Sequence, residues 1–315
     1  MTKNIADHAI HGMPWTAEKM QQAVKVLRQN ASVSFAFGRE PLESLIDLDD
    51  QVFKLRPDLE LHVWSVAPNK IITENELYRL ANMHHVHKIQ FSGFHNSSLP
   101  NIASMVQLTS LKLGTSKQLD ISFVENLTAL TRISLTGSFA SLASLRACTA
   151  LEWAYLSTTM DSFEFLSPLS NIKTLLIDYC IASNNFSPFN KPALKNLSIT
   201  SVTKLENVDA LAAFENLINL RIAGAHIKTL PPLHKLSKLE KLSLSNMKVW
   251  ENPEVIQTIP ALQMLALEEI NTKLKAEQFY FLSEMSTLKA LDFRFIDVNK
   301  GRIDKLNKAF KEKGM

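Results

Sequence analysis

Hydrophobic residues recur along most of this chain in one pattern: an apolar residue, two variable positions, an apolar residue, one variable position and a third apolar residue. The pattern begins at Val86, Leu108, Leu130, Leu151, Ile172, Leu194, Leu217, Leu239, Leu262 and Leu288. Successive starts are 21 to 26 residues apart, and all thirty positions are apolar in a chain that is 46% apolar. This regularity indicates tandem structural repeats.

Each repeat predicts a short β-strand. The last two apolar residues of the pattern are two positions apart, so their side chains point to the same side of a strand. Further apolar residues, such as Leu119, Val124 and Leu127, bring the chain back over the same core. One repeat cannot bury its apolar side alone, so stacked repeats are expected to form a continuous core under a parallel sheet.

The Leu-x-x-Leu-x-Leu units of residues 86–300 resemble the leucine-rich repeat family, and their period of about 22 residues is similar to its internalin-like and phosphatase-regulator-like branch. The resemblance implies an α/β solenoid with a curved parallel β-sheet on the concave face, short helices or irregular turns on the convex face, and helical caps. The family places Asn or Cys three residues after the last apolar strand residue. Here only Cys180 fits, so we expect less regular turns and no asparagine ladder.

We predict three segments: an N-terminal cap with a possible diverged repeat (1–57), a leucine-rich repeat array (58–300) and a C-terminal helical cap (301–315). In the first segment, the pattern predicts a helix over 16–29 with Thr16 as its N-cap. Strands over 32–37 and 59–63 are expected to belong to two diverged repeats, with Phe35 and Phe37 placed 26 residues before Leu61 and Val63.

Three further helices are predicted near the ends of the array. Thr73 and Glu76 have the spacing of a capping box, which favours a helix through Leu80. A helix over 275–285 would lengthen the ninth repeat, and a helix over 302–311 would close the core.

The variable strand positions form three columns of exposed side chains from repeat to repeat. Lys88, Lys112 and Arg132 make the first three repeats basic, and the next two repeats bring aromatic side chains together beside an acid. The predicted partner-binding residues are Trp153, Tyr155, Leu176, Asp178, Tyr179, Lys88, Lys112, Arg132 and Arg221. Trp, Tyr and Arg dominate interface energies. The alternative is that the aromatic side chains pack laterally and stabilise the sheet.

Composition narrows the class of protein. Lys and Arg total 34 against 31 Asp and Glu, so the net charge of +3 does not favour nucleic acid as a partner. No apolar run is long enough to span a membrane, and the first residues lack a secretory signal. With only two cysteines, Cys148 and Cys180, we expect a reducing compartment and a cytoplasmic protein, with a monomer favoured.

Motifs that carry chemistry are missing. No phosphate-binding loop, nucleophile elbow or zinc-protease motif is found, so the protein is predicted not to be an enzyme and to need no cofactor. The histidines could suggest a metal site, but surface histidines are the favoured interpretation; they are His84, His85, His87 and His95. Cys148 and Cys180 are expected to be buried thiols, and the acidic group at Asp47, Asp49 and Asp50 to be a solvated turn.

The sequence therefore favours a non-catalytic protein that recognises a protein partner through its concave face, as an adaptor or as an inhibitor or immunity-type protein. Two alternatives remain. One is a small-ligand or glycan-binding module, or a cryptic enzyme, around Tyr155, Asp178 and Tyr179. The other is a delivered effector that resembles bacterial leucine-rich repeat effectors.

Overall fold

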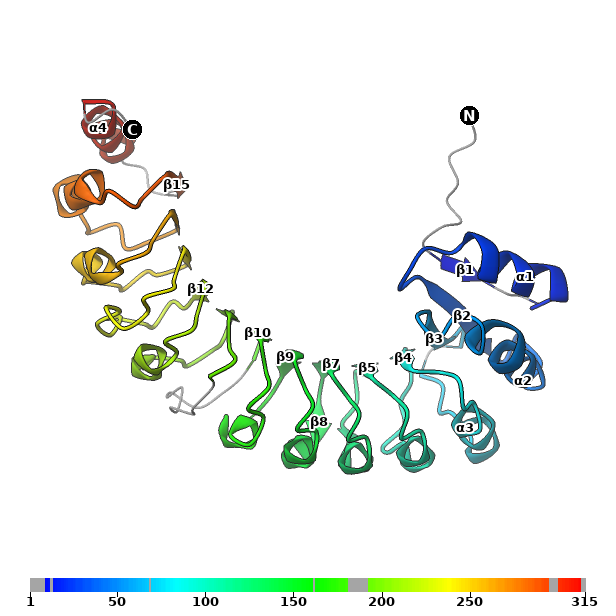
Figure 1. The fold of residues 1–315 in the computed structure, drawn as a ribbon. Coiled ribbons are helices and arrows are strands. Elements are labelled where there is room, and N and C mark those ends of the chain that lie inside the picture. Colours follow the sequence, from blue (N-terminus) through cyan, green and yellow to red (C-terminus); the bar gives the residue numbers. More distant parts are fainter. Residues whose placement is uncertain are drawn as a thin grey trace. The chain divides into compact units, whose positions relative to one another are not determined.

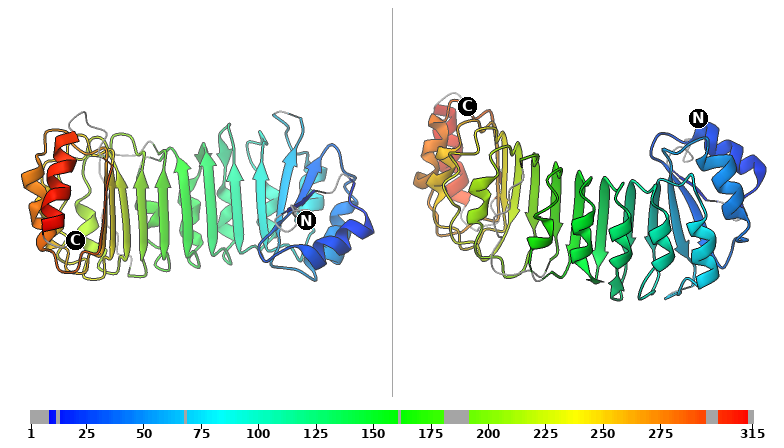
Figure 2. Two further views of the ribbon diagram at one scale, coloured as in Figure 1. Left: turned by 90° about the horizontal axis from the view of Figure 1, so that it is seen from above. Right: turned by 60° about the horizontal axis from the view of Figure 1, so that its bottom comes forward.

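The protein is described here by a computed structural model covering residues 9–11, 14–67, 69–160, 162–180, 192–294 and 300–312. The chain divides into two compact units, residues 1–153 and 154–315. In each unit, parallel strands form one layer, and helices and short helical turns cover one side of it (Figure 1). Figure 2 shows the strands of each unit lying side by side.

The first unit contains a parallel sheet in which the strands follow one another in chain order. Its strands are β1 (Ala9–His11), β2 (Ser32–Phe37), β3 (Glu60–Ser65), β4 (Lys88–Ser92), β5 (Ser110–Gly114) and β7 (Arg132–Gly137). Its helical segments are α1 (Ala17–Val26), α2 (Ser44–Leu48), the π-helical η2 (Asp49–Phe53), α3 (Glu74–Ala81), and the 3-10 helices η3 (Pro100–Ser104), η4 (Ser122–Asn126) and η5 (Leu142–Ala147). The two-residue strands β6 (Leu119–Asp120) and β8 (Phe139–Ala140) form a separate parallel pair.

The second unit repeats the same arrangement. Its strands are β9 (Trp153–Thr158, whose first residue ends the first unit), β10 (Thr174–Asp178), β11 (Asn196–Thr200), β12 (Asn219–Ala223), β13 (Lys241–Ser245), β14 (Met264–Glu268) and β15 (Ala290–Arg294). Its helical segments are the 3-10 helices η6 (Glu164–Leu166), η7 (Asp209–Ala213), η8 (Pro253–Thr258) and η9 (Ala276–Glu284), and α4 (Lys300–Glu312).

The repeat pattern produces this architecture as predicted. In β11 and β12, Leu197 pairs with Leu220 and Ile199 with Ile222, and all four side chains are at most 2% exposed. The residues between them, such as Ser198, alternate to the other side and are half-buried or exposed. Burial of one side of every strand explains why the period of two within each repeat is so strict.

The helix predicted over 16–29 is shorter than expected, at Ala17–Val26. It begins where predicted, because the Thr16 side chain accepts a hydrogen bond from the Lys19 backbone. It ends early because Leu27 takes an extended conformation, and Arg56 then donates hydrogen bonds to the carbonyl oxygens of Val24 (2.9 Å) and Leu27 (3.0 Å). A cation from a later segment thus satisfies the end of the helix.

The predicted offset of 26 residues between the first two diverged repeats is wrong. Val33 pairs with Leu61 and Phe35 pairs with Val63, an offset of 28. A shift by two residues keeps the same side chains on the buried side, so the hydrophobic pattern cannot distinguish the two registers. The observed register is accompanied by a hydrogen bond from the Glu60 backbone to the Ala31 carbonyl oxygen (2.9 Å). Strand β1, which pairs with β2, was not anticipated.

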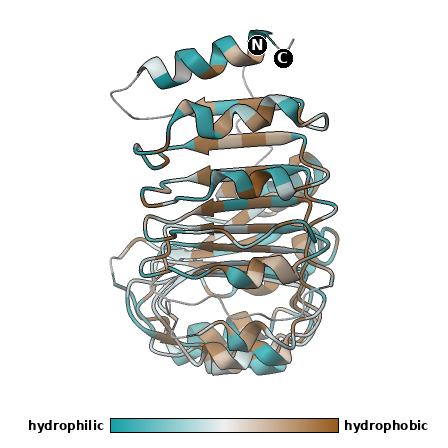
Figure 3. Ribbon diagram, turned by 90° about the vertical axis from the view of Figure 1, so that its left-hand side faces the viewer, coloured by the Kyte–Doolittle hydropathy of each residue, from teal (hydrophilic) through white to brown (hydrophobic). Residues whose placement is uncertain are grey.

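The three other helix predictions are confirmed. Thr73 and Glu76 form both hydrogen bonds of a capping box at the start of α3. The helix expected over 275–285 is the 3-10 helix η9. At the C-terminal end, α4 buries Arg302, Leu306 and Phe310, which are four residues apart and therefore lie on one face. Figure 3 shows the mixture of hydrophilic and hydrophobic positions along this terminal helix.

Asparagine side chains hold successive repeats together at places other than the family position. Asn252 bonds to both the backbone nitrogen and the carbonyl oxygen of Leu230 in the preceding repeat (3.0 and 2.9 Å) and accepts a hydrogen bond from the indole of the fully buried Trp250 (2.9 Å). Asn96 bonds in the same way to both backbone groups of Ile72. These amides satisfy backbone groups that no strand partner reaches.

We expect Asn252→Ala to lower the free energy of unfolding by about 1–3 kcal/mol, because the backbone groups of Leu230 and the indole of Trp250 lose their partner. Urea denaturation measures this. Asn207→Ala is the matched control, because Asn207 bonds only to the nearby Asp209, and its effect should stay below about 0.5 kcal/mol. Equal losses for the two variants would contradict the role of Asn252.

The ion pair between Asp58 and Arg56, which bonds to the end of α1, predicts that the stability of the protein depends on pH. Arg56 donates two hydrogen bonds to Asp58, and these bonds lower the pKa of the Asp58 carboxyl group below its usual value. A carboxyl group whose pKa is depressed by folding stabilises the protein fully above its unfolded pKa, and this contribution is lost as the pH falls through the folded pKa. Asp58→Asn should therefore lower the melting temperature at pH 7, and its difference from wild type should vanish in acid. A difference that persists at low pH would show that Asp58 acts otherwise.

Candidate binding surface

The exposed side of the strands carries the three predicted columns, and the strand pairing confirms their register. Lys88, Ser110 and Arg132 are partners in the first column, and Gln90, Lys112 and Ser134 in the second. In the second unit, the middle column includes Leu176, Ser198, Arg221, Ser243, Ala266 and Asp292. The sequence alone therefore identified which side chains share this side of the sheet.

The basic residues of the first unit make local contacts. Lys112 forms an ion pair with Glu60 on β3 (2.8 Å), although its own strand holds no acid. Lys88 donates hydrogen bonds to the Asn30 side chain (2.6 Å) and to the Asp58 carbonyl oxygen (2.9 Å). These two ammonium groups are therefore partly compensated by the N-terminal segments of the same unit.

Arg132 and Trp153 form a contact that sequence spacing did not suggest. The Arg132 guanidinium lies over the Trp153 ring, 4.4 Å from the ring centre. Cation–π contacts at exposed sites contribute about 0.5–1 kcal/mol. Trp153 is half-buried, and its contact with Arg132 lies within the first unit.

The other predicted residues gather in the second unit. Tyr155, Leu176, Asp178, Tyr179 and Arg221 all line one hollow with a volume of about 460 Å³, which we call the polar hollow. Asp178 accepts a hydrogen bond from the Thr200 hydroxyl (2.7 Å), and the Tyr179 side chain is 74% exposed. Glu268 and Glu269 also line this hollow, and they were not among the predicted site residues.

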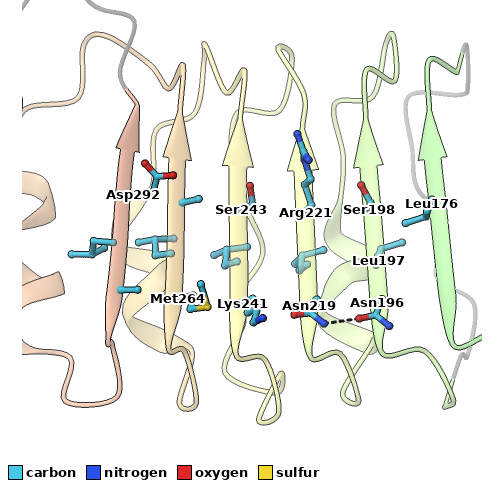
Figure 4. Close-up of a pocket in the computed structure, with 16 residues that line it drawn as sticks. Leu176, Asn196, Leu197, Ser198, Asn219, Arg221, Lys241, Ser243, Met264 and Asp292 are labelled. Carbon is cyan, nitrogen blue, oxygen red and sulfur yellow. Dashed lines mark hydrogen bonds between the residues drawn. The ribbon is translucent and has the colours of Figure 1, made fainter. Parts of the chain in front are cut away.

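A second hollow of the same unit was missed. It has a volume of about 420 Å³ and lies on the first and middle columns; we call it the apolar hollow. Figure 4 shows the short side chain of Ser198 between Leu176 and Arg221, and that of Ser243 on the next strand beyond Arg221. Short residues in the middle column leave space between the longer side chains, and the buried leucines Leu242 and Leu265 form part of the lining beneath. The run of Ser and Ala at these positions was the available sequence signal.

A left-handed backbone position follows the strands at the edge of the polar hollow. Tyr179, Ser201, Asn246 and Glu269 each lie two residues after the last apolar strand residue and have φ between 46° and 53°. Gly93 and Gly137 take the same place in earlier repeats. Residues other than glycine pay about 1–2 kcal/mol for this conformation. A large side chain here, above all Tyr179, is therefore retained against a backbone cost, which is common at functional sites.

The surroundings of the two cysteine thiols indicate structural roles. Cys180 donates from its Sγ to the Leu156 carbonyl oxygen (3.2 Å), the role that the family position implies. Both cysteines are free and buried, and burial raises the pKa of Cys148 to about 11, so its thiol stays protonated at neutral pH.

Two of the four histidines considered as a metal site, His84 and His85, are bound by Asp49. Its carboxylate accepts from the backbone nitrogens of His84 and His85 (both 2.9 Å) and lies 3.0 Å from the His85 ring nitrogen Nδ1. Asp49 is buried, unlike the solvated turn that we expected. Among the described residues, no group of three His, Cys, Asp or Glu side chains could hold a metal ion. Nor do those residues contain a helix with the length and apolar character needed to cross a bilayer.

Comparison with known proteins supports the fold. No protein-family model and no curated protein matches the chain. Among solved structures, an internalin, inlF, from Listeria monocytogenes str. 4b F2365 is similar at 17% identity, over 85% of this chain and 92% of that one, with a TM-score of 0.50. The plant peptide hormone receptor RGFR1, solved in complex with RGF2, matches at 15% identity over 83% of this chain and 55% of that one, with a TM-score of 0.46. The internalin likeness shows that this chain has the leucine-rich repeat fold, of the internalin-like type that its repeats predict.

Substitution of the exposed Tyr179 distinguishes a role of its ring in binding from a role in lateral packing. Tyr179→Asn should leave the free energy of unfolding unchanged or raise it by up to about 1 kcal/mol, because asparagine tolerates the left-handed conformation better than tyrosine. Thermal and urea denaturation check this. Tyr280→Asn, on η9, is a matched control without the left-handed backbone. A loss of more than about 1 kcal/mol for Tyr179→Asn would favour lateral packing as the role of this ring.

Proposed function

We propose that this protein is a non-catalytic binding protein that recognises a protein partner through the exposed sheet face of its second unit. The observation that carries the proposal is the clustering of Tyr155, Leu176 and the 74%-exposed Tyr179 around the polar hollow, next to the apolar hollow. Exposed apolar surface of this kind is costly unless it meets a partner. Tyr179 moreover occupies a left-handed backbone position that recurs in other repeats, and the fold does not require a tyrosine there, since Gly93 and Gly137 occupy it in earlier repeats.

The architecture supports such a role energetically. From β9 to β14, each strand of this face is held on its other side by buried aliphatic residues, so the exposed side chains project from a packed support. Binding to a preformed surface avoids much of the ordering cost that flexible loops would incur. An adaptor and an inhibitor or immunity-type protein would both use such a surface, and we propose a cytoplasmic location for either.

The polar hollow also favours a second candidate, a small-ligand or glycan-binding module. Its volume of about 460 Å³ lies within the range of small-molecule sites, and Tyr155, Asp178 and Tyr179 bring two phenol groups and a carboxylate to it. A thermal-shift screen of monosaccharides and short oligosaccharides separates the two candidates. A sugar that raises the melting temperature in proportion to its concentration supports the ligand-binding module.

The main proposal is tested by comparing two double variants. Tyr155→Ala/Tyr179→Ala removes both phenol groups of the polar hollow, and Tyr78→Ala/Tyr280→Ala removes two exposed phenol groups of the helices α3 and η9. Quantitative capture from native lysate identifies a protein that wild type recovers, and calorimetry with purified components measures its Kd. We expect the site variant to weaken binding on the order of 100-fold and the control to change it less than about threefold.

Equal weakening by both double variants, or by neither, would contradict recognition at this face. Circular dichroism melting of each variant establishes beforehand that it is folded.

A further inference from the structure

On the exposed face of the second unit, Lys241 places a positive charge at the amino-terminal end of its strand. Lys241 and Arg221 are both exposed and line the apolar hollow. Within the described part of the chain, neither takes part in an ion pair, whereas Arg294 pairs with Asp292 (2.7 Å) and Lys228 with Glu251 (3.3 Å). In Figure 4, Lys241 lies at the amino-terminal end of β13, and Arg221 extends toward the carboxyl end of its own strand.

Acidic side chains lie at the carboxyl ends of two other strands of this face, β10 and β14. Asp178, Glu268 and Glu269 all line the polar hollow, and each is a last strand residue or the residue that follows it. The Asp178 carboxylate accepts hydrogen bonds from the Thr200 hydroxyl and the Tyr179 backbone nitrogen. Between Lys241 and the acidic pair Glu268 and Glu269, the charge thus changes sign along the strand direction, with the apolar hollow between them. Arg294, the strand partner of Glu268, pairs with Asp292.

Strand pairing gives the spacing of these three features. Lys241 pairs with Met264, Ser243 with Ala266, and Ser245 with Glu268. The positive and negative positions are therefore four residues apart along neighbouring strands, or about 13 Å at the usual rise per residue. The short side chains of Ser243 and Ala266 lie midway, at the apolar hollow. An extended chain aligned with the strands places alternate side chains over successive columns at the same spacing.

We propose that this face binds an extended segment of a partner protein that presents an acidic, a large apolar and a basic side chain at alternate positions. This inference rests on the proposed function and specifies its ligand. The carboxylate lies over Lys241, the apolar side chain enters the apolar hollow, and the cation lies over Glu268 and Glu269. Burial of the apolar side chain supplies most of the affinity, because exposed ion pairs contribute little, and the two charges set orientation and specificity.

A displayed library of random twelve-residue peptides, selected on the immobilised full-length protein, tests this pattern. We expect enriched peptides to share the order acid, any residue, large apolar residue, any residue, base, read in either direction. The decisive variant is Lys241→Glu, which makes both ends of the site acidic and should select base, apolar and base instead. Lys235→Glu is the matched control, because Lys235 is exposed in the same unit and lines neither hollow, and it should select the wild-type order.

Affinities of one enriched peptide give the second readout. By fluorescence anisotropy, Lys241→Glu should raise its Kd about tenfold, and a peptide with its acid changed to lysine should recover most of that loss. Ala266→Trp, which fills the apolar hollow from a half-buried surface position, should abolish binding. If either variant melts below wild type by more than a few degrees, Lys241→Met and Ala266→Leu replace them.

Three results would overturn the inference: no enrichment above uncoated support, enriched peptides without the charge order, or the same order selected by Lys241→Glu and wild type. The proposed function would survive any of these if a captured protein still depends on Tyr155 and Tyr179. It would fail separately if capture is unaffected by the loss of both tyrosines.

Discussion

Each repeat of this protein has an apolar side that it cannot cover by itself, and the next repeat provides the cover. This constraint sets the strand register, since Leu197 must lie beside Leu220 and Leu220 beside Leu242 for the core to be continuous. It also sets the exposed face, because every second strand residue must then point away from the core. The three columns of exposed side chains are a by-product of burial on the other side.

That separation leaves the exposed positions free to vary without cost to the fold. In the second unit they include the short side chains Ser198, Ser243 and Ala266 in the middle column, and charged and aromatic side chains around them. None of these choices improves the core. Tyr179 likewise lies in a left-handed turn where earlier repeats have Gly93 and Gly137, at a backbone cost that core packing does not explain.

Between strands, different side chains supply the hydrogen bonds to backbone groups from one repeat to the next. Cys180 uses its thiol at the position that the family reserves for Asn or Cys, whereas Asn96 and Asn252 reach the preceding repeat from other places in the turn. At the first helix, Arg56 supplies bonds that a local capping residue would otherwise make. In these irregular repeats, side chains at different positions therefore satisfy backbone groups that would otherwise lack a partner.

The hydrophobic pattern alone determined the strands of the ten regular repeats and the side chains that share the exposed face, because a period of two inside a repeated unit permits only one buried side. Alignment of equivalent positions in successive repeats predicted pairings such as Leu197 with Leu220. It did not determine the register of β2 against β3, since a shift by two residues buries the same side of Phe35. Nor could it show that Lys112 pairs with Glu60, that Arg132 covers Trp153, or that short side chains open a hollow beside Lys241. Those features depend on where side chains from different repeats end in space, and only tertiary structure decides that.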